Sequence, residues 1–525
     1  MTKPPARSSA DERVRFWYAV ALSRLAMENT RGALRALEAG LRVADEHRDT
    51  LGATELRVLA ATGSADLAGL GLDLVLERRD APAVLGWTER WRARSLSHPR
   101  AVPPANPDLA RLLGELRQIV ARVEQATLGE EPLAELEGER ARLEAEIRAL
   151  SLRSGSDGSA RRLVGPPSVA QIRAHLGDGL LVEFLERDDD LYAVSCDRGA
   201  CRLWHLGSAR AIDRQRAGLV FSLSRLAYRR HSAASLEAAA RLLRRSASAL
   251  DDVLVGPVAR LLDRAASDRR PIILVPTGEL HSIPWSLLPR LSGVPLQVAP
   301  SASLLVGLTP PADRSSGNVV IVTGPGVATA ETEVRCLRRL YPSAIVLEGE
   351  RATSAAFSAA LEGAAMAHIA AHGRFRSDNA LFSALELYDG PLTVYDLETI
   401  VEPPAIMVLS ACDAGRSQVH PGNELMGTTA ALLSMGTESI VASVAPIPDV
   451  ASPAVMARLH EVLLKAGSVT SALAAVQSEM AVNDLSEDEL VAGSFAASTA
   501  LAAGAFVCFG AAPSARARVP GKITA

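Results

Sequence analysis

Two apolar segments of the sequence each end next to a residue that can take part in nucleophilic chemistry. Residues 365–371 are followed by His372 and Gly373, and residues 406–411 are followed by Cys412. Short apolar segments bounded by turn residues are typical of buried parallel strands. In open α/β sheets, chemistry gathers beyond the carboxyl ends of such strands. A cysteine and a histidine at these ends are the parts of a thiol nucleophile and its general base.

The sequence position of Cys412 separates it from the other four cysteines. Cys508 lies inside an apolar strand, and Cys336 lies in an amphipathic helix. Cys196 and Cys201 flank a polar turn, which predicts a β-hairpin. A buried cysteine behaves as a small hydrophobic residue, so we expect these four to be structural.

The 40 residues that separate His372 from Cys412 are enough for one crossover and a neighbouring strand (412 − 372 = 40). The base and the nucleophile would then lie side by side. The backbone N–H groups of Gly373 and Cys412 can form an oxyanion hole, since glycine lets a carbonyl approach its backbone. His368 precedes His372 by four residues, a spacing that can also bind a metal. Its place within a strand, with no acidic ligand nearby, favours a site without metal.

The segment after Cys412 is expected to complete the site. Asn423 can cap a helix over 425–435, and a strand over 440–444 follows. The chain then leaves this strand in a loop that reaches Asp449, next to the strand of the nucleophile. Asp449 has two interpretations: the acidic floor of a pocket for Arg or Lys, or the N-cap of a helix over 451–464.

Bulk composition limits the classes of function. The chain has 525 residues, so we expect more than one domain. Its net charge of −4, from 56 basic and 60 acidic residues, gives no argument for nucleic acid or an anionic membrane. Five scattered cysteines without a C-x-x-C pair disfavour a disulfide framework and a structural zinc site, and favour a reducing compartment such as the cytoplasm. The N-terminus does not resemble a secretory signal. The uncharged stretch 491–515 is expected to be a buried helix and a strand.

Four regions are predicted along the chain. Residues 1–100 have helical periodicity and form a helical scaffold that loosely suggests TPR-like repeats. Residues 101–153 form a helical hairpin, and 154–167 form a linker rich in Gly, Ser and Arg. Residues 168–525 alternate strands with helices, which predicts an α/β domain with a mainly parallel sheet. The expected strands are 180–185, 191–196, 202–206, 272–275, 319–322, 344–347, 365–371, 406–411, 440–444 and 506–509.

Five ordered segments of this sequence resemble CHAT domains, which are caspase-like cysteine proteases related to separase. The two site motifs are HIAAHG at 368–373 and VLSACDAG at 408–415. Segments 272–285 and 299–304 resemble two further family segments. Residues 87–96 resemble the helix that often closes the TPR region upstream of CHAT.

The resemblance implies a caspase-like α/β fold and an endopeptidase that acts on proteins. Cys412 would be the nucleophile, His372 the general base and Gly373 an oxyanion donor, with no cofactor and no metal. Many relatives lie behind helical sensor domains in bacterial defence or regulatory systems. A regulatory protein partner is therefore expected at the N-terminal helical domain.

The chain departs from the family after the strand that follows Cys412. Relatives commonly have Leu-Trp there, whereas this chain has Val444 and Ala445. The missing Trp would open the substrate pocket at Ala445. With Asp449, or Asp378 in the loop after His372, as its carboxylate, such a pocket would favour Arg or Lys at P1.

Two other functions compete with the protease. One is a catalytically silent caspase-like scaffold for protein–protein interaction, in which the helices are the working part. The other is a different thiol enzyme of the α/β class, such as an acyltransferase or amidase. The intact pair His372 and Cys412 argues against the scaffold.

Overall fold

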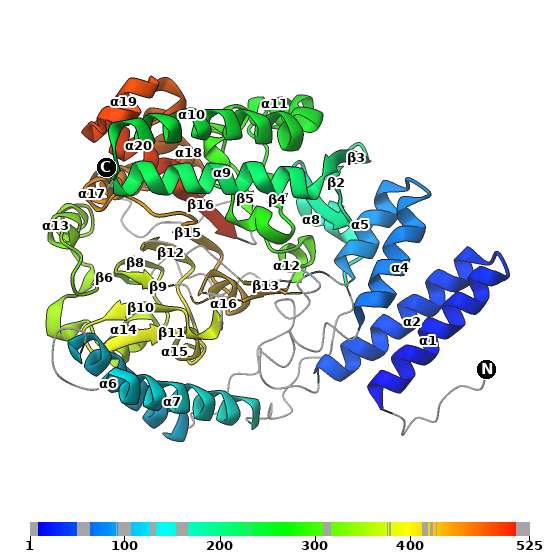
Figure 1. Cartoon of the computed structure of the whole chain (residues 1–525), viewed down its shortest axis with the longest axis horizontal. Coiled ribbons are helices and arrows are strands. Elements are labelled where there is room, and N and C mark those ends of the chain that lie inside the picture. Colours follow the sequence, from blue (N-terminus) through cyan, green and yellow to red (C-terminus); the bar gives the residue numbers. More distant parts are fainter. Residues whose placement is uncertain are drawn as a thin grey trace.

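Figure 1 shows the protein as a computed structural model of the whole chain. The structure describes residues 9–49, 64–90, 92, 107–126, 133–153, 166–229, 231–307, 317–374, 376, 380–411, 418–420, 424–426 and 428–510. Everything below refers to these residues.

An eleven-stranded, mostly parallel sheet forms the centre of the molecule. Its strands are, in spatial order, β3 (Cys201–Ser208), β2 (Asp190–Cys196), β1 (Leu180–Arg187), β4 (Ile272–Val275), β5 (Gln297–Val298), β16 (Phe506–Gly510), β15 (Ser439–Ser443), β12 (Ile406–Ser410), β8 (Met366–Ala370), β6 (Val319–Thr323) and β7 (Ile345–Leu347). Only the pairs β1–β2, β2–β3 and β15–β16 are antiparallel among the described strands of this sheet. The predicted α/β class is confirmed, and each expected strand is present.

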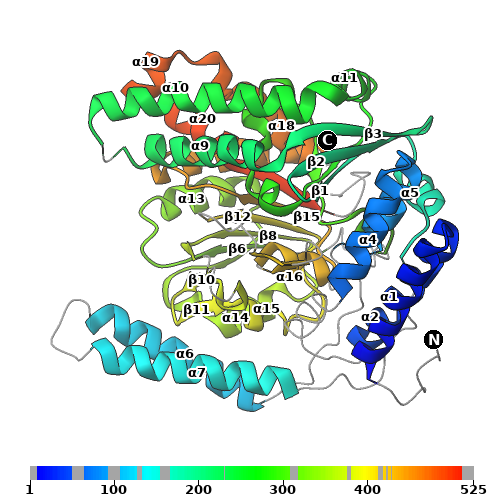
Figure 2. The same ribbon diagram turned by 45° about the vertical axis from the view of Figure 1, so that its right-hand side comes forward.

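Helices cover both faces of the sheet, as a sheet whose central strands are buried on both faces requires. All five residues of β6, β8 and β12 are buried. Helices α13 (Ala330–Leu340) and α17 (Ser452–Ala466) pack together, and Figure 2 shows α13 above these strands. On the other side lie α14 (Ser354–Leu361) and a small sheet of β9 (Gly373–Arg374), β10 (Ala384–Leu387) and β11 (Gly390–Thr393).

The remaining elements of the α/β region complete this arrangement. The helices are α8 (Val169–Leu176), α9 (Ala209–Tyr228), α10 (Ala233–Leu250), α11 (Ala259–Ser267), α12 (Ala302–Gly307), α15 (Val394–Leu397), α16 (Thr428–Ser434), α18 (Val469–Glu479), α19 (Glu487–Ala492) and α20 (Phe495–Ala505). The strands β13 (Gln418–His420) and β14 (Glu424–Met426) pair as a separate ribbon. Helix α20 and β16 confirm the expected buried helix and strand after residue 491. None of the described helices is both long and apolar enough to span a membrane.

The N-terminal region is helical, as predicted. It contains α1 (Ala10–Ala26), α2 (Thr30–Asp49), α4 (Ala65–Leu76) and α5 (Ala81–Glu89). The buried side chains of these helices belong to the same apolar core as those of the large sheet. The N-terminal helices are therefore packed onto the α/β region through a continuous core.

Helices α6 (Pro107–Ala126) and α7 (Leu133–Arg153) pack along each other, as the hairpin prediction required. The expected turn at 129–132 and most of the expected linker lie outside the described residues. The apolar faces of the two helices share a second core with Phe382, Tyr395 and Ala431. The hairpin thus packs against the part of the α/β region that lies between β8 and β15.

Two local predictions were wrong. Cys196 and Cys201 are directly opposite in the β2–β3 pairing and form a disulfide, whereas we expected no disulfide. The expected helix over 425–435 begins only at Thr428, because residues 424–426 pair with 418–420 as β14 and β13. The polar loop after the nucleophile strand therefore contains a β-ribbon as well as the start of a helix.

Candidate active site

The strands that precede His372 and Cys412 are neighbours in the sheet. β8 and β12 are parallel, and Ala370 is paired with Ser410 at their carboxyl ends. His372 and Cys412 each follow two residues after this pair. The prediction that the two residues follow adjacent strands is confirmed. Cys412 itself lies outside the described residues, and Ala411 before it is buried.

His372 is exposed at the end of β8, where a general base can reach a substrate. Its carbonyl oxygen accepts a hydrogen bond from the N–H of Glu386 at 2.9 Å, which fixes the backbone at this position. The ring lies against Gly326, in the loop after β6. A Cβ at Gly326 would be 3.5 Å from Nε2 of His372. Gly326 has a φ of +73°, so glycine also suits this turn conformationally.

Gly373 begins β9 and lies opposite Leu385 of β10. In an antiparallel pair, hydrogen-bonded and non-hydrogen-bonded residue pairs alternate along the strands. Because the N–H of Glu386 bonds to His372, the next pair, Gly373 with Leu385, is of the non-hydrogen-bonded kind. This geometry turns the N–H of Gly373 away from β10, as an oxyanion donor would need.

The predicted pocket residues have different outcomes. Asp449 begins a short 3-10 turn before α17, and the N-cap of α17 is Ala451, so the capping interpretation of Asp449 was wrong. Ala445 follows β15 beside β12 but is fully buried, which leaves no exposed surface at this residue. Asp378 lies outside the described residues. A preference for Arg or Lys at P1 stays a prediction.

Sequence reasoning missed the surroundings of His368. This side chain is fully buried on β8, and its Nε2 lies 2.7 Å from Oε1 of Glu333 on α13. Its Nδ1 lies 3.0 Å from Nε2 of His460 on α17. The acidic neighbour that we did not expect is therefore present, as a hydrogen-bond partner. No group of three or more His, Cys, Asp or Glu side chains among the described residues could hold a metal ion.

The helical hairpin contacts the loop that follows His372. Arg376 of this loop forms an ion pair with Glu144 on α7, and its N–H bonds to Oγ of Ser383 at 3.1 Å. Both charged side chains of the pair are mostly buried. The ion pair therefore links the hairpin directly to the segment that leaves β9.

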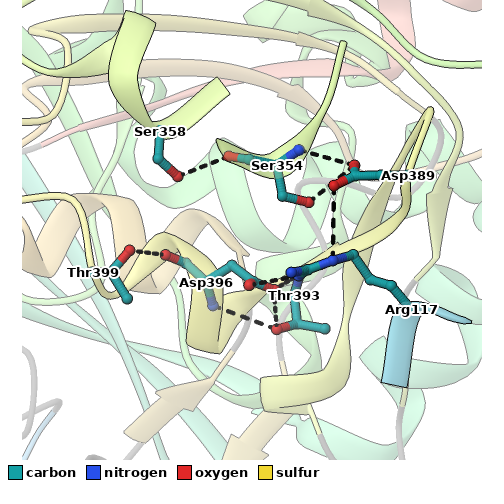
Figure 3. A network of polar contacts seen from close by, with 7 residues as sticks. All are labelled: Arg117, Ser354, Ser358, Asp389, Thr393, Asp396 and Thr399. Carbon is teal, nitrogen blue, oxygen red and sulfur yellow. Dashed lines mark hydrogen bonds and ion pairs between the residues drawn. The ribbon is translucent and has the colours of Figure 1, made fainter. Parts of the chain in front are cut away.

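A second ionic contact fixes the hairpin to the small sheet. In Figure 3, Arg117 of α6 reaches both Asp396 and Asp389, with Nη1 2.9 Å from Oδ1 of Asp396. Asp396 accepts from the backbone N–H of Thr393, the N-cap of α15, and Asp389 accepts from the backbone N–H of Ser354, both at 2.8 Å. Each carboxylate thus holds α6 and an element of the α/β region at once.

The segments that resemble the family outside the two site motifs meet in one buried cluster. Arg92 is fully buried, and its guanidinium donates to the carbonyl oxygens of Pro276 and Phe184. Its Nε lies 3.3 Å from Oε1 of Glu183 on β1. Glu89, also fully buried, accepts from the backbone N–H groups at the start of α12, including Ala302 at 3.0 Å.

The electrostatics of this cluster are unbalanced, since it contains two buried carboxylates, Glu183 and Glu89, and one buried guanidinium, which pairs with Glu183. Burial raises the pKa of Glu183 well above its ordinary value, and the neighbouring Glu89 carboxylate raises it further. The Arg92 charge acts in the opposite direction. Arg92 is therefore the counter-charge of the buried Glu183, whereas Glu89 is held by the backbone N–H groups of α12.

The fold and the site together define a class: α/β proteins in which a histidine and a cysteine follow two adjacent parallel strands of the central sheet. The CHAT domain family model matches residues 244–510, which is more than half of the chain. The chain belongs to the CHAT domain family. The sheet extends beyond the matched residues, because β1, β2 and β3 precede them.

Solved structures of separase share this fold. The structure of the Saccharomyces cerevisiae separase–securin complex matches with a TM-score of 0.50 at 9% identity, over 95% of this chain and 40% of that chain. Such a likeness shows the fold alone, and the chain spans less than half of the separase chain. The Arg-specific cysteine proteinase gingipain R also matches, with a TM-score of 0.34 and 10% identity over 50% of this chain and 68% of that chain. No curated protein matched the sequence.

Proposed function

We propose that the protein is a cysteine endopeptidase that cleaves a partner protein. In this mechanism the thiolate of Cys412 attacks a peptide carbonyl. His372 promotes formation of the thiolate and then protonates the leaving amine. The N–H of Gly373 stabilises the oxyanion, and water hydrolyses the acyl-enzyme. The observation that carries the proposal is the register of β8 and β12, which pairs Ala370 with Ser410 and so aligns the chain just before both residues.

The proposal places the enzyme in the cytoplasm, where thiols remain reduced. A cysteine nucleophile has to remain a free thiol, which such a compartment ensures. The Cys196–Cys201 disulfide would be open there. It lies on β2 and β3, at the edge of the sheet that is farthest from β8 and β12 in strand order.

A search for new protein N-termini tests the activity. We expect cells of the native host that express the active chain to contain N-termini that are missing from cells with the Cys412→Ala variant. Purified active protein should then produce the same cleavage in the isolated substrate. If both forms give the same N-termini at equal expression and with the partner present, the chain is a scaffold. Transfer of an acyl group without cleavage would instead identify another thiol enzyme.

We further propose that the N-terminal helical regions control the protease, in a bacterial defence or regulatory system. The support is the position of the hairpin, which contacts the loop after His372 through Arg376 and packs on Ala431 of α16, after the Cys412 loop. A protein partner that shifts α6 and α7 would change both segments that flank the site. Such a partner acts only through different affinities for the two arrangements.

The Glu144–Arg376 ion pair provides a test of this control. We expect Glu144→Ala to lower kcat/KM for the identified substrate roughly tenfold, which corresponds to about 1.4 kcal/mol, because the loop after His372 loses its anchor on α7. Glu146→Ala is the matched control, since the ion pair of Glu146 with Arg142 of the same helix is largely exposed and does not contact the loop after His372. Equal rates for both variants, with and without the partner, would contradict control through this contact.

A further inference from the structure

Six buried polar side chains connect the two strands of the candidate site with the two helices that cover them. His368 is on β8 and Ser410 is the last residue of β12. Glu333 is on α13, and Tyr341 is the C-cap residue of that helix. Ser452 and His460 are on α17. The six are less than a tenth exposed, and His368, His460 and Glu333 are 0%, 0% and 1% exposed.

Hydrogen bonds join these side chains into one continuous chain. Starting at the nucleophile strand, Oγ of Ser410 lies 2.6 Å from Oγ of Ser452. Ser452 in turn donates to Oε2 of Glu333 at 3.1 Å. Because the single hydroxyl proton of Ser452 goes to the carboxylate, Ser410 is the donor in the first bond.

The chain continues from the carboxylate to the other strand. Oε1 of Glu333 faces Nε2 of His368 at 2.7 Å, and Nδ1 of His368 faces Nε2 of His460 at 3.0 Å. The hydroxyl of Tyr341 lies 3.1 Å from Nδ1 of His460. Each polar atom named in this series of hydrogen bonds has a partner, so the network is continuous from Ser410 to Tyr341.

The protonation of the network follows from its burial. Burial lowers the pKa of His460 well below its ordinary value, and the neighbouring His368 lowers it further, so His460 is neutral. Burial raises the pKa of Tyr341, so its hydroxyl keeps its proton. A carboxylate oxygen accepts hydrogen bonds, so Nε2 of His368 is the donor to Oε1 of Glu333. Glu333 therefore accepts from both strands at once, directly from His368 and through Ser452 from Ser410.

We propose that this network, which we call the Glu333 network, positions Cys412 relative to His372. This inference rests on the proposed function of the dyad. The network holds two neighbouring strands against the same carboxylate: β8 through His368, which pairs with Val408 in the register, and β12 through its last residue, Ser410. His372 follows His368 by four residues, and Cys412 follows Ser410 by two. A displacement of about 1 Å at a reacting group can lower a rate 100-fold. A carboxylate that holds β8 through His368 and the end of β12 through Ser452 limits such displacements.

A purely structural role would not need these residue types. Well-packed apolar residues often replace a buried ion pair or polar group without loss of stability, because burial of charge is costly. The rest of β8 and most of β12 are apolar. The polar residues of these two strands are His368, in the middle of β8, and Ser410, at the end of β12, and their partners lie on α13 and α17. The network is therefore better explained by what it positions than by the stability that it provides.

Removal of the Ser452 hydroxyl tests the proposal with little change in side-chain volume. We expect Ser452→Ala to slow alkylation of Cys412 by iodoacetamide roughly tenfold at pH 7. The apparent pKa of the thiol should also rise towards about 8.5, the value of a free cysteine. Both changes follow because the thiol is held less closely to the His372 imidazole. Peptide mass spectrometry separates labelling of Cys412 from that of Cys336, the half-buried free thiol of α13.

Two variants control this experiment. Ser246→Ala also removes a buried hydroxyl, but one that lies on α10, outside the network. This hydroxyl donates a hydrogen bond to Oε1 of Gln215 on α9 at 3.3 Å. The variant should alkylate like the wild type. Ser410→Ala cuts the same link from the strand side, so it should reproduce Ser452→Ala, and the double variant should show no further loss. A Ser452→Ala or Ser410→Ala protein that folds and alkylates like Ser246→Ala would overturn the inference.

The alkylation readout needs no protein substrate, so the two proposals can fail separately. If the wild type cleaves its partner but the network variants have an unchanged thiol pKa, only the positioning inference is wrong. If the network variants alter the reactivity of Cys412 but no form cleaves a protein, the network stands and the protease proposal is wrong. Thermal unfolding of each variant confirms that the folded protein is compared.

Discussion

Cys412→Ala is expected to abolish cleavage of the partner protein. His372→Ala should lower the kcat of this cleavage by roughly 10²–10⁴-fold. The difference follows from the roles of the two groups. Without the thiol no acyl-enzyme can form, whereas without the imidazole a small fraction of thiolate remains at pH 7. Because the two residues act as a unit, the double variant should lose no more than Cys412→Ala alone.

The matched control for Cys412→Ala is Cys336→Ala, which removes the half-buried free thiol of α13. Cys336 lies on α13 and belongs neither to the candidate site nor to the Glu333 network, so the variant should keep the wild-type rate. Cys508 is less suitable, since it is fully buried and its environment raises its thiol pKa to about 12. Cleavage by Cys412→Ala at the wild-type rate would contradict the entire mechanism.

The sheet could be predicted because its strands carry their own signal. Strands such as β8 and β12 are uninterrupted apolar segments bounded by turn residues, and this pattern reflects burial on both faces. Their adjacency followed from the 40 residues between His372 and Cys412, which fit one crossover. The short strand β5 has two residues and owes its pairing to β4 and β16, so local sequence could not reveal it.

The polar contacts of the site could not be predicted for a related reason. Glu333 and His460 lie 35 and 92 residues from His368 in the sequence, and only the packing of α13 and α17 brings them together. The contact of Arg376 with Glu144 spans 232 residues. Single-sequence patterns report local periodicity and strand order, whereas such pairs depend on how helices dock on the sheet. The resemblance to CHAT domains identified the segments but not their contacts.

The buried cluster around Arg92 shows how three of the segments that resemble the family contact one another. Residues 87–96 resemble a family helix upstream of the α/β region, and Arg92 joins that helix to the backbone at Pro276 and Phe184. Glu89 from the same segment joins it to the start of α12. The helical region and the sheet are therefore connected by ionic contacts that no solvent screens, as well as by their common core.

Arg92→Ala should lower the free energy of unfolding by about 3–5 kcal/mol, because it leaves the buried carboxylate of Glu183 without its counter-charge. Denaturant unfolding measures the loss. Arg90→Ala is the matched control from two residues earlier. Arg90 pairs with Glu38 at 3.4 Å, and both side chains are about one-third exposed, so this variant should lose no more than about 1 kcal/mol.

The pH dependence of this loss distinguishes charge from packing. The folded-state pKa of Glu183 is raised above its ordinary value of 4.5, and loss of Arg92 raises it further. A group with a raised folded-state pKa binds protons more tightly when folded, so its stabilisation is complete below the ordinary pKa and is lost as the pH rises. The deficit of Arg92→Ala should therefore shrink as the pH falls from 7 towards 4.5. Adding Glu183→Gln should recover part of the deficit at pH 7. A deficit that is the same at every pH, and that Glu183→Gln does not change, would show that Arg92 acts through packing alone.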